Sequence, residues 1–456
     1  MEPDWEGPLG EAYARAMTYL QNLPERPVGA SAAASELRRR LGGELPQGPG
    51  NPTQIIEALA DGVEGGLVAT GSARFFGFVI GGATPASLAA DWLATVWDQN
   101  AGLYAAAPAA AVVEEIAAEW LVELFGLPEQ TSVGFVTGGQ MANFTALAAA
   151  RYDVLRKAGW DVEADGLIGA PAIRVLVGAE RHDTVDRALR FLGLGTRCMV
   201  PIAVDGQGRM RPDALAPELG QGPTIVCAQA GNVNTGAIDP LDDICELTTD
   251  AWVHVDGAFG LWSTVGTPIR GIAKADSWAT DAHKWLNVPY DSGLVFTAHP
   301  EAHRAAMSVR ASYLIHDAEK RDPLDYNPEF SRRARGIAVY AAIRALGRSG
   351  IVELVDRCCA MASRFAEQLR EAGADVLNDV TLNQVLVRFG DDDLTRRVVT
   401  AVQQEGTAWA SGTTWHGRAA MRISVSNWTT SAIDVDRSVE AITRCVEIEQ
   451  ARSTQG

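Results

Sequence analysis

The sequence predicts an α/β protein whose main sheet is mostly parallel. Between about residues 132 and 298, short apolar runs alternate with segments of helical periodicity. The apolar runs are rich in β-branched residues and only about four to seven residues long, as expected for strands that are buried on both faces. The chain has 456 residues, which exceeds the length over which a single core normally grows. We therefore expect a large α/β domain with smaller parts attached to it.

The elements of the large domain follow one another as strands and helices. Its predicted strands are SVGFVT, IRVLVGAE, TIVCAQA, WVHVDGA, SWATDAH and SGLVFTA. Helical periodicity separates several of them, in MANFTALAAARYDVLRK, DTVDRALRFLG and PLDDICELTTD. Strands that alternate with helices in this way form parallel sheets through crossover connections.

A small α+β domain is predicted at the C-terminal end. The segments RRARGIAVYAAIRALGRSG and IVELVDRCCAMASRFAEQLREAG have the pattern of two helices separated by a glycine turn. The strand-like segments ADVLN, NQVLVRF, AWASGTTW and AAMRISV follow, with one helix at about 392–405 and another from 431. This mixed order of strands and helices is typical of an α+β unit.

The first 84 residues have a different character. Their Gly/Pro-rich passage LGGELPQGPGNP separates two helical segments, which indicates an extended arm that packs on another surface, with a partner subunit as the natural candidate. We therefore divide the chain into an N-terminal arm and dimerisation segment (1–84), a large domain that holds the binding site (85–345) and a small C-terminal domain (346–456).

Composition and charge restrict the location and the partners. The 39 basic and 57 acidic side chains give a formal net charge of −18, which disfavours a nucleic-acid or anionic membrane partner. The longest apolar stretch, GFVIGGATPASLAADWLATVW, contains Pro85 and Asp91, which argues against a membrane span. The N-terminus has no signal-peptide pattern, so we expect a cytoplasmic protein. The cysteines show no metal-ligand spacing, and we expect no metal site and reduced thiols at Cys198, Cys227, Cys245, Cys358, Cys359 and Cys445.

The ends of three predicted strands carry residues with a shared chemistry. TGGQMAN places a Gly-Gly turn at the start of a helix, where free N–H groups and the helix dipole suit a phosphate. HVDGAFG places Asp256 at the end of another strand, and TDAHK places Lys284 after the next. Ligands collect at the carboxyl ends of parallel strands, so these groups should converge. Pyridoxal phosphate needs all three: a phosphate site, a lysine that forms an imine with its aldehyde, and a carboxylate at its pyridine nitrogen.

The segment ADSWATDAHKW (275–285) resembles the active-site lysine segment of the pyridoxal-phosphate-dependent group II decarboxylases, the family of the aromatic-L-amino-acid and glutamate decarboxylases. The resemblance extends from about residue 70 to 427. It implies the aspartate-aminotransferase (type I) fold and an obligate homodimer with active sites at the interface. It also implies that Lys284 carries the cofactor, Asp256 pairs with the pyridine nitrogen, and His182 stacks on the ring. The remaining cofactor contacts that it implies are Ala258 under the ring and Gly138, Gly139, Gln140, Asp281 and His283 around the phosphate.

Further residues are candidates with alternative explanations. Asn232 and Thr235 in AGNVNTGAID either bind the cofactor or substrate or form a turn. Arg422 either binds the substrate α-carboxylate or is a solvated strand residue. The charged, Pro-rich stretch 313–336 has the pattern of an exposed flexible loop, and the family resemblance makes its Tyr326 the candidate proton donor. The pocket wall for the substrate would include Phe78, Asn100 and Tyr104.

These observations favour a carboxy-lyase of amino-acid metabolism that converts an L-amino acid, with an aromatic side chain as one option, to its amine and carbon dioxide through an external aldimine and a quinonoid. The first alternative is a carbon–carbon lyase, an aldolase or an oxidative aldehyde-forming enzyme that uses the same cofactor. The second alternative is a protein of this fold that only binds cofactor or a partner, which would not need Lys284, Asp256 and His182 together.

Overall fold

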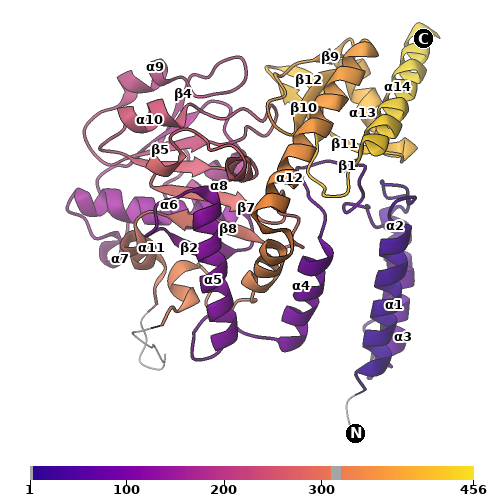
Figure 1. Ribbon diagram of the computed structural model, residues 1–456, viewed down its shortest axis with the longest axis horizontal. Coiled ribbons are helices and arrows are strands. Elements are labelled where there is room, and N and C mark those ends of the chain that lie inside the picture. The colour runs from indigo at the N-terminus through magenta and orange to yellow at the C-terminus, as the bar shows by residue number, and fades with distance from the viewer. Residues whose placement is uncertain (1–3, 310–319, 456) are drawn as a thin grey trace.

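The computed structural model describes residues 4–309 and 320–455. It contains one sheet of seven strands and one sheet of five, with helices packed against both (Figure 1). No helix in these two ranges is both long enough and apolar enough to cross a lipid bilayer.

The larger sheet has the strand order β2-β8-β7-β6-β5-β3-β4. Its strands are β2 (Ser132–Val136), β3 (Arg174–Gly178), β4 (Met199–Ile202), β5 (Thr224–Gln229), β6 (Trp252–Asp256), β7 (Ser277–Asp281) and β8 (Gly293–Thr297). All neighbours pair in parallel except β8, which is antiparallel to both β2 and β7. The predicted α/β fold with a mostly parallel sheet is therefore confirmed, although the sequence segments predicted neither β4 nor the reversed direction of β8.

Helices cover both faces of this sheet, which explains why β5, β6, β7 and β8 are buried along their whole length. One layer contains α6 (Gly139–Lys157), α8 (Asp183–Phe191) and α11 (Pro300–Met307), and the other contains α5 (Pro108–Phe125), η2 (Gly260–Val265) and the first part of α12 (Gly336–Glu371). Shorter helices lie in the connections: α7 (Val162–Asp165), α9 (Pro212–Leu215), η1 (Ala216–Glu218), α10 (Leu241–Leu247), η3 (Ile272–Lys274) and η4 (Pro323–Tyr326).

The smaller sheet has the order β1-β11-β12-β10-β9. It contains β1 (Phe75–Phe76), β9 (Asp375–Val376), β10 (Gln384–Arg388), β11 (Trp409–Trp415) and β12 (Arg418–Ser424). The helices α12 and α13 (Asp392–Glu405) pack against it, and α14 (Ala432–Gln455) packs on these two helices. Asp391 caps α13 by accepting a hydrogen bond from the Leu394 N–H, and Gly406 ends it with a left-handed φ of 86°. The expected glycine break is found inside α12 at Gly347, where φ is 62°.

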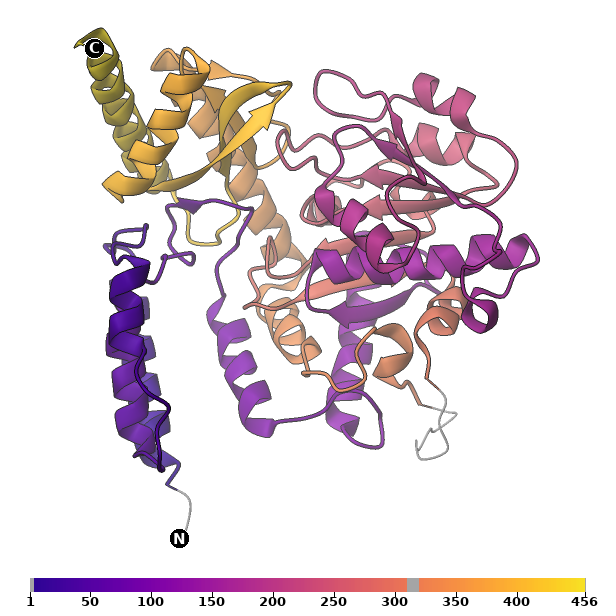
Figure 2. The same ribbon diagram turned by 180° about the vertical axis from the view of Figure 1, so that it is seen from behind.

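The N-terminal segment is helical on both sides of its Gly/Pro-rich passage. Its helices are α1 (Glu6–Asn22), α2 (Ala34–Leu41) and α3 (Pro52–Val63), and α4 (Pro85–Trp97) follows them. The helices α1 and α3 lie side by side as a rod beside the rest of the chain (Figures 1 and 2). Large apolar side chains of this region are exposed, including Leu9, Tyr13, Ile55, Leu59, Trp92, Val96 and Trp97.

The stretch that was expected to be an exposed flexible loop is packed in the part that the structure describes. Residues 310–319 lie outside the described residues. From Asp322 onward the chain is held by hydrogen bonds: the Tyr104 N–H donates to Asp322 Oδ1 at 2.8 Å, and the Leu324 N–H donates to the Gly102 carbonyl at 2.9 Å. The expectation is therefore wrong for this part, because its charged side chains bind other parts of the chain rather than water.

A buried ion pair anchors the end of that stretch. The Arg332 guanidinium lies 2.8 Å from Oε1 of Glu114 on α5, and both side chains are completely buried. Arg332 also donates to the carbonyl oxygens of Ala101 at 2.7 Å and Phe135 at 2.8 Å. A buried charge that loses its partner is strongly destabilising, so the contact fixes this stretch to α5 and β2.

We predict that Arg332→Met lowers the free energy of unfolding by about 3–5 kcal/mol, because it leaves the Glu114 carboxylate buried with only the more distant Arg321 as a countercharge. The matched control is Arg348→Met, which removes the exposed ion pair with Glu123 (3.1 Å). That control is expected to change stability by less than about 1 kcal/mol. Urea denaturation followed by circular dichroism measures both, and equal losses for the two variants would contradict the prediction.

Candidate active site

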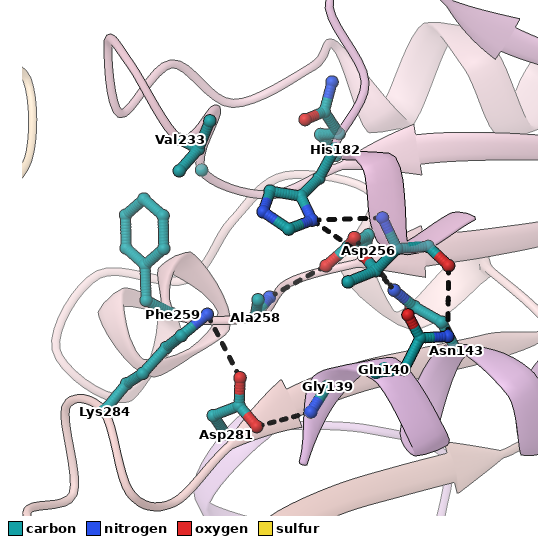
Figure 3. Close-up of a pocket in the computed structure, with 13 residues that line it drawn as sticks. Gly139, Gln140, Asn143, His182, Val233, Asp256, Ala258, Phe259, Asp281 and Lys284 are labelled. Carbon is teal, nitrogen blue, oxygen red and sulfur yellow. Dashed lines mark hydrogen bonds and ion pairs between the residues drawn. The ribbon is translucent and has the colours of Figure 1, made fainter. Parts of the chain in front are cut away.

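A pocket lies at the carboxyl ends of β5, β6 and β7, beside the first turns of α6 and α8 (Figure 3). Ligands of parallel α/β sheets bind at this edge. The sequence-predicted residues that line the pocket are Gly139, Gln140, His182, Asp256, Ala258, Asp281 and Lys284. The lining residues that sequence reasoning missed are Asn143, Thr184, Gln229, Gly231, Val233 and Phe259.

Lys284 enters the pocket from the turn that follows β7. Its Nζ lies 3.1 Å from Oδ2 of Asp281, and its side chain is only 19% exposed. Figure 3 shows the Lys284 amine above the Asp281 carboxylate, near Phe259 and Ala258. The amine of Lys284 is therefore directed into a pocket rather than into solvent.

Asp281 connects the lysine to the start of α6. Its Oδ1 accepts a hydrogen bond from the Gly139 N–H at 2.5 Å and lies 3.4 Å from Nε2 of His283. A Cβ on Gly139 would lie only 2.9 Å from Asp281 Oδ2, so a larger residue there would displace the Asp281 carboxylate. His283 does not line the pocket; its ring stacks on Tyr290 with centroids 4.2 Å apart, and burial lowers its pKa.

Asp256 is the last residue of β6 and is only 5% exposed. Its Oδ2 accepts a hydrogen bond from Nδ2 of Asn143 at 3.0 Å, and its Oδ1 accepts one from the Ala258 N–H at 3.2 Å. Each carboxyl oxygen therefore has a hydrogen-bond donor, and the two donors fix the orientation of the Asp256 side chain in the pocket that Lys284 also lines.

His182 caps the N-terminus of α8. Its Nδ1 accepts a hydrogen bond from the Thr184 N–H at 3.2 Å and lies 2.9 Å from the Thr184 hydroxyl oxygen. The capping contact fixes the ring over the mouth of the pocket, with Asp256 behind it (Figure 3).

Asn232 and Thr235 do not line the pocket, and their side chains form hydrogen bonds within the turn after β5. Asn232 Oδ1 accepts from the N–H groups of Asn234 and Thr235, and its Nδ2 donates to the Glu180 carbonyl at 3.0 Å. The Thr235 hydroxyl donates to the Gln207 carbonyl at 2.7 Å. These contacts correspond to the turn-forming alternative for both residues.

The residues expected to contact the substrate also lie outside this pocket. Phe78 is 60% exposed and packs beside Trp409, with ring centroids 5.2 Å apart. Asn100 accepts a hydrogen bond from the Arg332 N–H at 3.1 Å, and the Tyr104 ring lies 6.0 Å from Nζ of Lys320. Their contact with a substrate stays a prediction.

Arg422 is a buried cation on β12. Met421 and Ile423 face the helices of the small domain, so the alternation of a strand turns Arg422 to the opposite face. Gln384 shares that face and packs against Gly236 in the turn that leads from the pocket. Arg422 is 9% exposed, its Nε has no hydrogen-bond partner, and burial lowers its pKa to about 10.

Tyr326 ends η4 and packs away from the pocket of its own chain. Its ring lies 4.6 Å from the Arg321 guanidinium carbon and 5.4 Å from the His303 ring. The suggestion that it donates a proton stays a prediction for this chain.

The chemistry of the pocket fits pyridoxal phosphate. Asp256 is a buried carboxylate, Lys284 supplies an amine, and the start of α6 supplies main-chain N–H groups that have no helical acceptor. A Cβ on Gly138 would lie 3.2 Å from the His283 ring, so the absence of side chains keeps this turn open. These are the groups that the cofactor requires at its pyridine nitrogen, its aldehyde and its phosphate.

Comparisons with known proteins agree with this chemistry. Residues 35–389 match the model of the pyridoxal-dependent decarboxylase conserved domain. The chain is 27% identical to an aromatic-L-amino-acid decarboxylase of Bacillus atrophaeus, over 90% of this chain and 88% of the relative. It is 30% identical to an L-2,4-diaminobutyrate decarboxylase of Rhizobium meliloti, over 79% and 75%. Its fold matches the crystal structure of Oryza sativa TDC with PLP and tryptamine, with a TM-score of 0.91, 22% identity and 98% of each chain covered.

The comparisons confirm the type I fold, the cofactor and the decarboxylase chemistry that the lysine segment predicts. The family model covers most of the chain and includes Lys284, Asp256 and His182. The chain belongs to the pyridoxal-dependent decarboxylase family.

Proposed function

We propose that this chain removes the α-carboxylate of an L-amino acid at the pocket that contains Lys284 and Asp256. When bound, pyridoxal phosphate supplies a ring that accepts electrons from the substrate Cα. The observation that carries the proposal is the position of an amine and a buried carboxylate on opposite sides of one pocket, beside a helix N-terminus. Gly138, Gly139 and Gln140 would bind the phosphate, and Asp281 and His283 would fix that turn.

Each of the central side chains has a distinct proposed role. Lys284 would bond to the cofactor aldehyde and release it when the substrate amine binds. Asp256 would hold a proton at the pyridine nitrogen, since its oxygens are already oriented by two donors. His182 would cover one face of the ring and Ala258 the other, which excludes water from the reacting bonds.

We predict that Lys284→Ala abolishes both the visible absorbance of covalently bound cofactor and nearly all turnover. Lys274→Ala, which removes an exposed lysine near β7, should retain both and serves as the control. The assay incubates the holoenzyme with a panel of L-amino acids and measures carbon dioxide, amine, ammonia and hydrogen peroxide. Equal amounts of carbon dioxide and amine support decarboxylation. Ammonia and peroxide, or an aldehyde without carbon dioxide, would instead support the oxidative or carbon–carbon lyase alternative.

We propose that Arg422 binds the α-carboxylate of the substrate. The support is its buried guanidinium, which has no hydrogen-bond partner at Nε and faces away from the helices of the small domain. A buried cation of this kind is costly unless an anion accompanies it, so a substrate carboxylate would complete the site.

Arg422→Met is expected to raise KM for the amino acid by about 10- to 100-fold, the loss of a charged hydrogen bond worth about 1.5–3 kcal/mol. The affinity of the apoprotein for pyridoxal phosphate should stay close to that of the unmodified chain. Arg418→Met, on the same strand at an exposed position, is the control. An unchanged KM, or a loss of cofactor affinity equal to the loss of substrate affinity, would contradict the assignment.

We further propose that the substrate side chain is aromatic rather than acidic. Phe78 and Trp409 form an aromatic surface at the edge of the small sheet. Lys284 is the only lysine or arginine among the described residues that line the pocket, which gives no support to an acidic side chain.

We also propose a cytoplasmic location, which the unpaired cysteines support.

We propose that the enzyme is a homodimer with shared active sites. The support is the N-terminal apolar surface, defined as Leu9, Tyr13, Ile55, Leu59, Trp92, Val96 and Trp97 on α1, α3 and α4. Tyr13 and Trp92 meet edge to face at 6.3 Å, which joins α1 to α4. Exposed apolar surfaces of this kind mark protein interfaces, and a partner subunit would cover it.

Trp97→Glu should raise the dissociation constant of the dimer by about 30-fold or more, since central aromatic residues contribute about 2 kcal/mol or more to an interface. The control is Ile168→Glu, at a residue that is 95% exposed and follows shortly after α7, which lies on the opposite side of the molecule from α1 and α3 (Figure 1). Sedimentation velocity should give twice the mass of one 48.6 kDa chain for the unmodified protein and the control. A monomeric unmodified protein, or a Trp97→Glu variant that dimerises as the control does, would refute the interface.

A further inference from the structure

A continuous chain of buried hydrogen bonds leads from the core of the large domain to Asp256. The Trp252 Nε1–H donates to Ser277 Oγ at 2.8 Å, and Ser277 Oγ lies 3.0 Å from His254 Nδ1. His254 Nε2 lies 2.9 Å from Asn143 Oδ1, and Asn143 Nδ2 donates to Asp256 Oδ2 at 3.0 Å. His254 and Ser277 are 0% exposed, and Asn143 is 1% exposed.

The period of a β-strand explains how this chain of bonds forms. In β6, Trp252, His254 and Asp256 alternate with Val253 and Val255, so the polar side chains share the face that α6 covers. Register places His254 opposite Ser277 of β7. The pattern W-x-H-x-D in WVHVDGA is the sequence signal that would have indicated this arrangement.

The donor and the acceptor of each hydrogen bond in this chain follow from the charge of the Asp256 carboxylate. An ionised carboxylate can only accept, so the Asn143 amide nitrogen must face Asp256 and its oxygen must face His254. His254 must therefore donate from Nε2. A neutral imidazole has only one N–H, so Nδ1 accepts the Ser277 hydroxyl proton, and Ser277 Oγ accepts from Trp252. Burial lowers the pKa of His254 to about 4, which agrees with a neutral ring near pH 7.

A branch of the same network orients His182. Asn143 Nδ2 also lies 3.1 Å from Thr184 Oγ1 and donates its second proton there. The Thr184 hydroxyl is then free to donate to His182 Nδ1, at 2.9 Å. His182 therefore carries its own proton on Nε2. Asn143 thus connects the carboxylate at the base of the pocket to the ring at its mouth (Figure 3).

We propose that His254 and Asn143 are positioning residues that hold the Asp256 carboxylate in its orientation toward the cofactor. The inference rests on the proposed role of Asp256. It assigns to the buried histidine of β6 a function that does not require contact with cofactor or substrate. A purely structural role, in which the same bonds only join α6, β6 and β7, makes a different prediction.

The variants His254→Phe and Asn143→Leu should weaken pyridoxal phosphate binding to the apoprotein by about 10- to 100-fold, the effect of losing a hydrogen bond that supports a charge. His254→Gln, whose amide can still donate to Asn143, should bind within about threefold of the unmodified chain. Titration of the apoprotein by fluorescence measures these affinities. At saturating cofactor, kcat should fall while KM for the amino acid stays within about threefold.

His303→Phe is the matched control, because His303 is also completely buried, has a strongly lowered pKa and bonds to Ser132 at 2.9 Å, but lies outside the pocket. It should destabilise the apoprotein in urea without changing cofactor affinity. If His254→Phe and His303→Phe have the same small effect on cofactor affinity, His254 is structural and the proposal is overturned. That outcome would leave the proposed function intact, since Lys284→Ala tests it independently.

A second measurement is made on the unmodified chain and uses a variant, the conservative His254→Gln, only to assign the resonance. Side-chain ¹⁵N NMR of histidine-labelled apoprotein should show His254 as a neutral ring with its proton on Nε2 between pH 6 and 8. The chain has only 7 histidines, and His254→Gln identifies the resonance. A protonated ring, or a proton on Nδ1, would reverse the order of donors and overturn the proposal.

Discussion

The buried carboxylate of Asp256 is the constraint on which the rest of the site depends. A carboxylate in the core is unfavourable unless hydrogen-bond donors or a positive charge replace the lost water. In the described structure the donors are the Asn143 amide and the Ala258 N–H. Asn143 must therefore direct its amide nitrogen toward Asp256. The orientation of this amide in turn determines which ring nitrogen carries the proton in His254 and, through Thr184, in His182. One charged group thus determines the orientation of polar side chains on β6, β7, α6 and α8.

A second constraint is the close approach of main-chain segments at the turn that precedes α6, for which we propose phosphate binding. A Cβ on Gly293 at the start of β8 would lie 2.4 Å from Cα of Gly138, which leaves no space for any other residue. The antiparallel direction of β8 brings Gly293 opposite Asp281 and Val136 in register. Asp281 can then reach the Gly139 N–H and Lys284 together. The position of Lys284 consequently depends on the strand pairing of the sheet as well as on the turn that contains the lysine.

Strand ends could be located from the sequence because they depend on local pattern. Asp256 and Lys284 follow apolar runs, and parallel topology then brings such residues to one edge. Asn143, Thr184 and Gln229 were missed because their role depends on contacts between distant segments, which local periodicity does not encode. The expected exposed loop was wrong at residues 322–327 for the same reason: its acidic and polar residues resemble a solvated segment, but they bond to distant parts of the chain.

The structure separates the pocket around Lys284 from residues that were predicted to contact the substrate. Asp256 and its partners are held by buried hydrogen bonds, whereas Phe78 is exposed and Tyr104 lies outside the pocket of its own chain. Side chains at an exposed surface can change without disturbing a buried hydrogen-bond network, because they share no partners with it. The family includes relatives named for an aromatic amino acid and for diaminobutyrate, and a separation of this kind lets side chains that face the substrate differ without a change in the buried network.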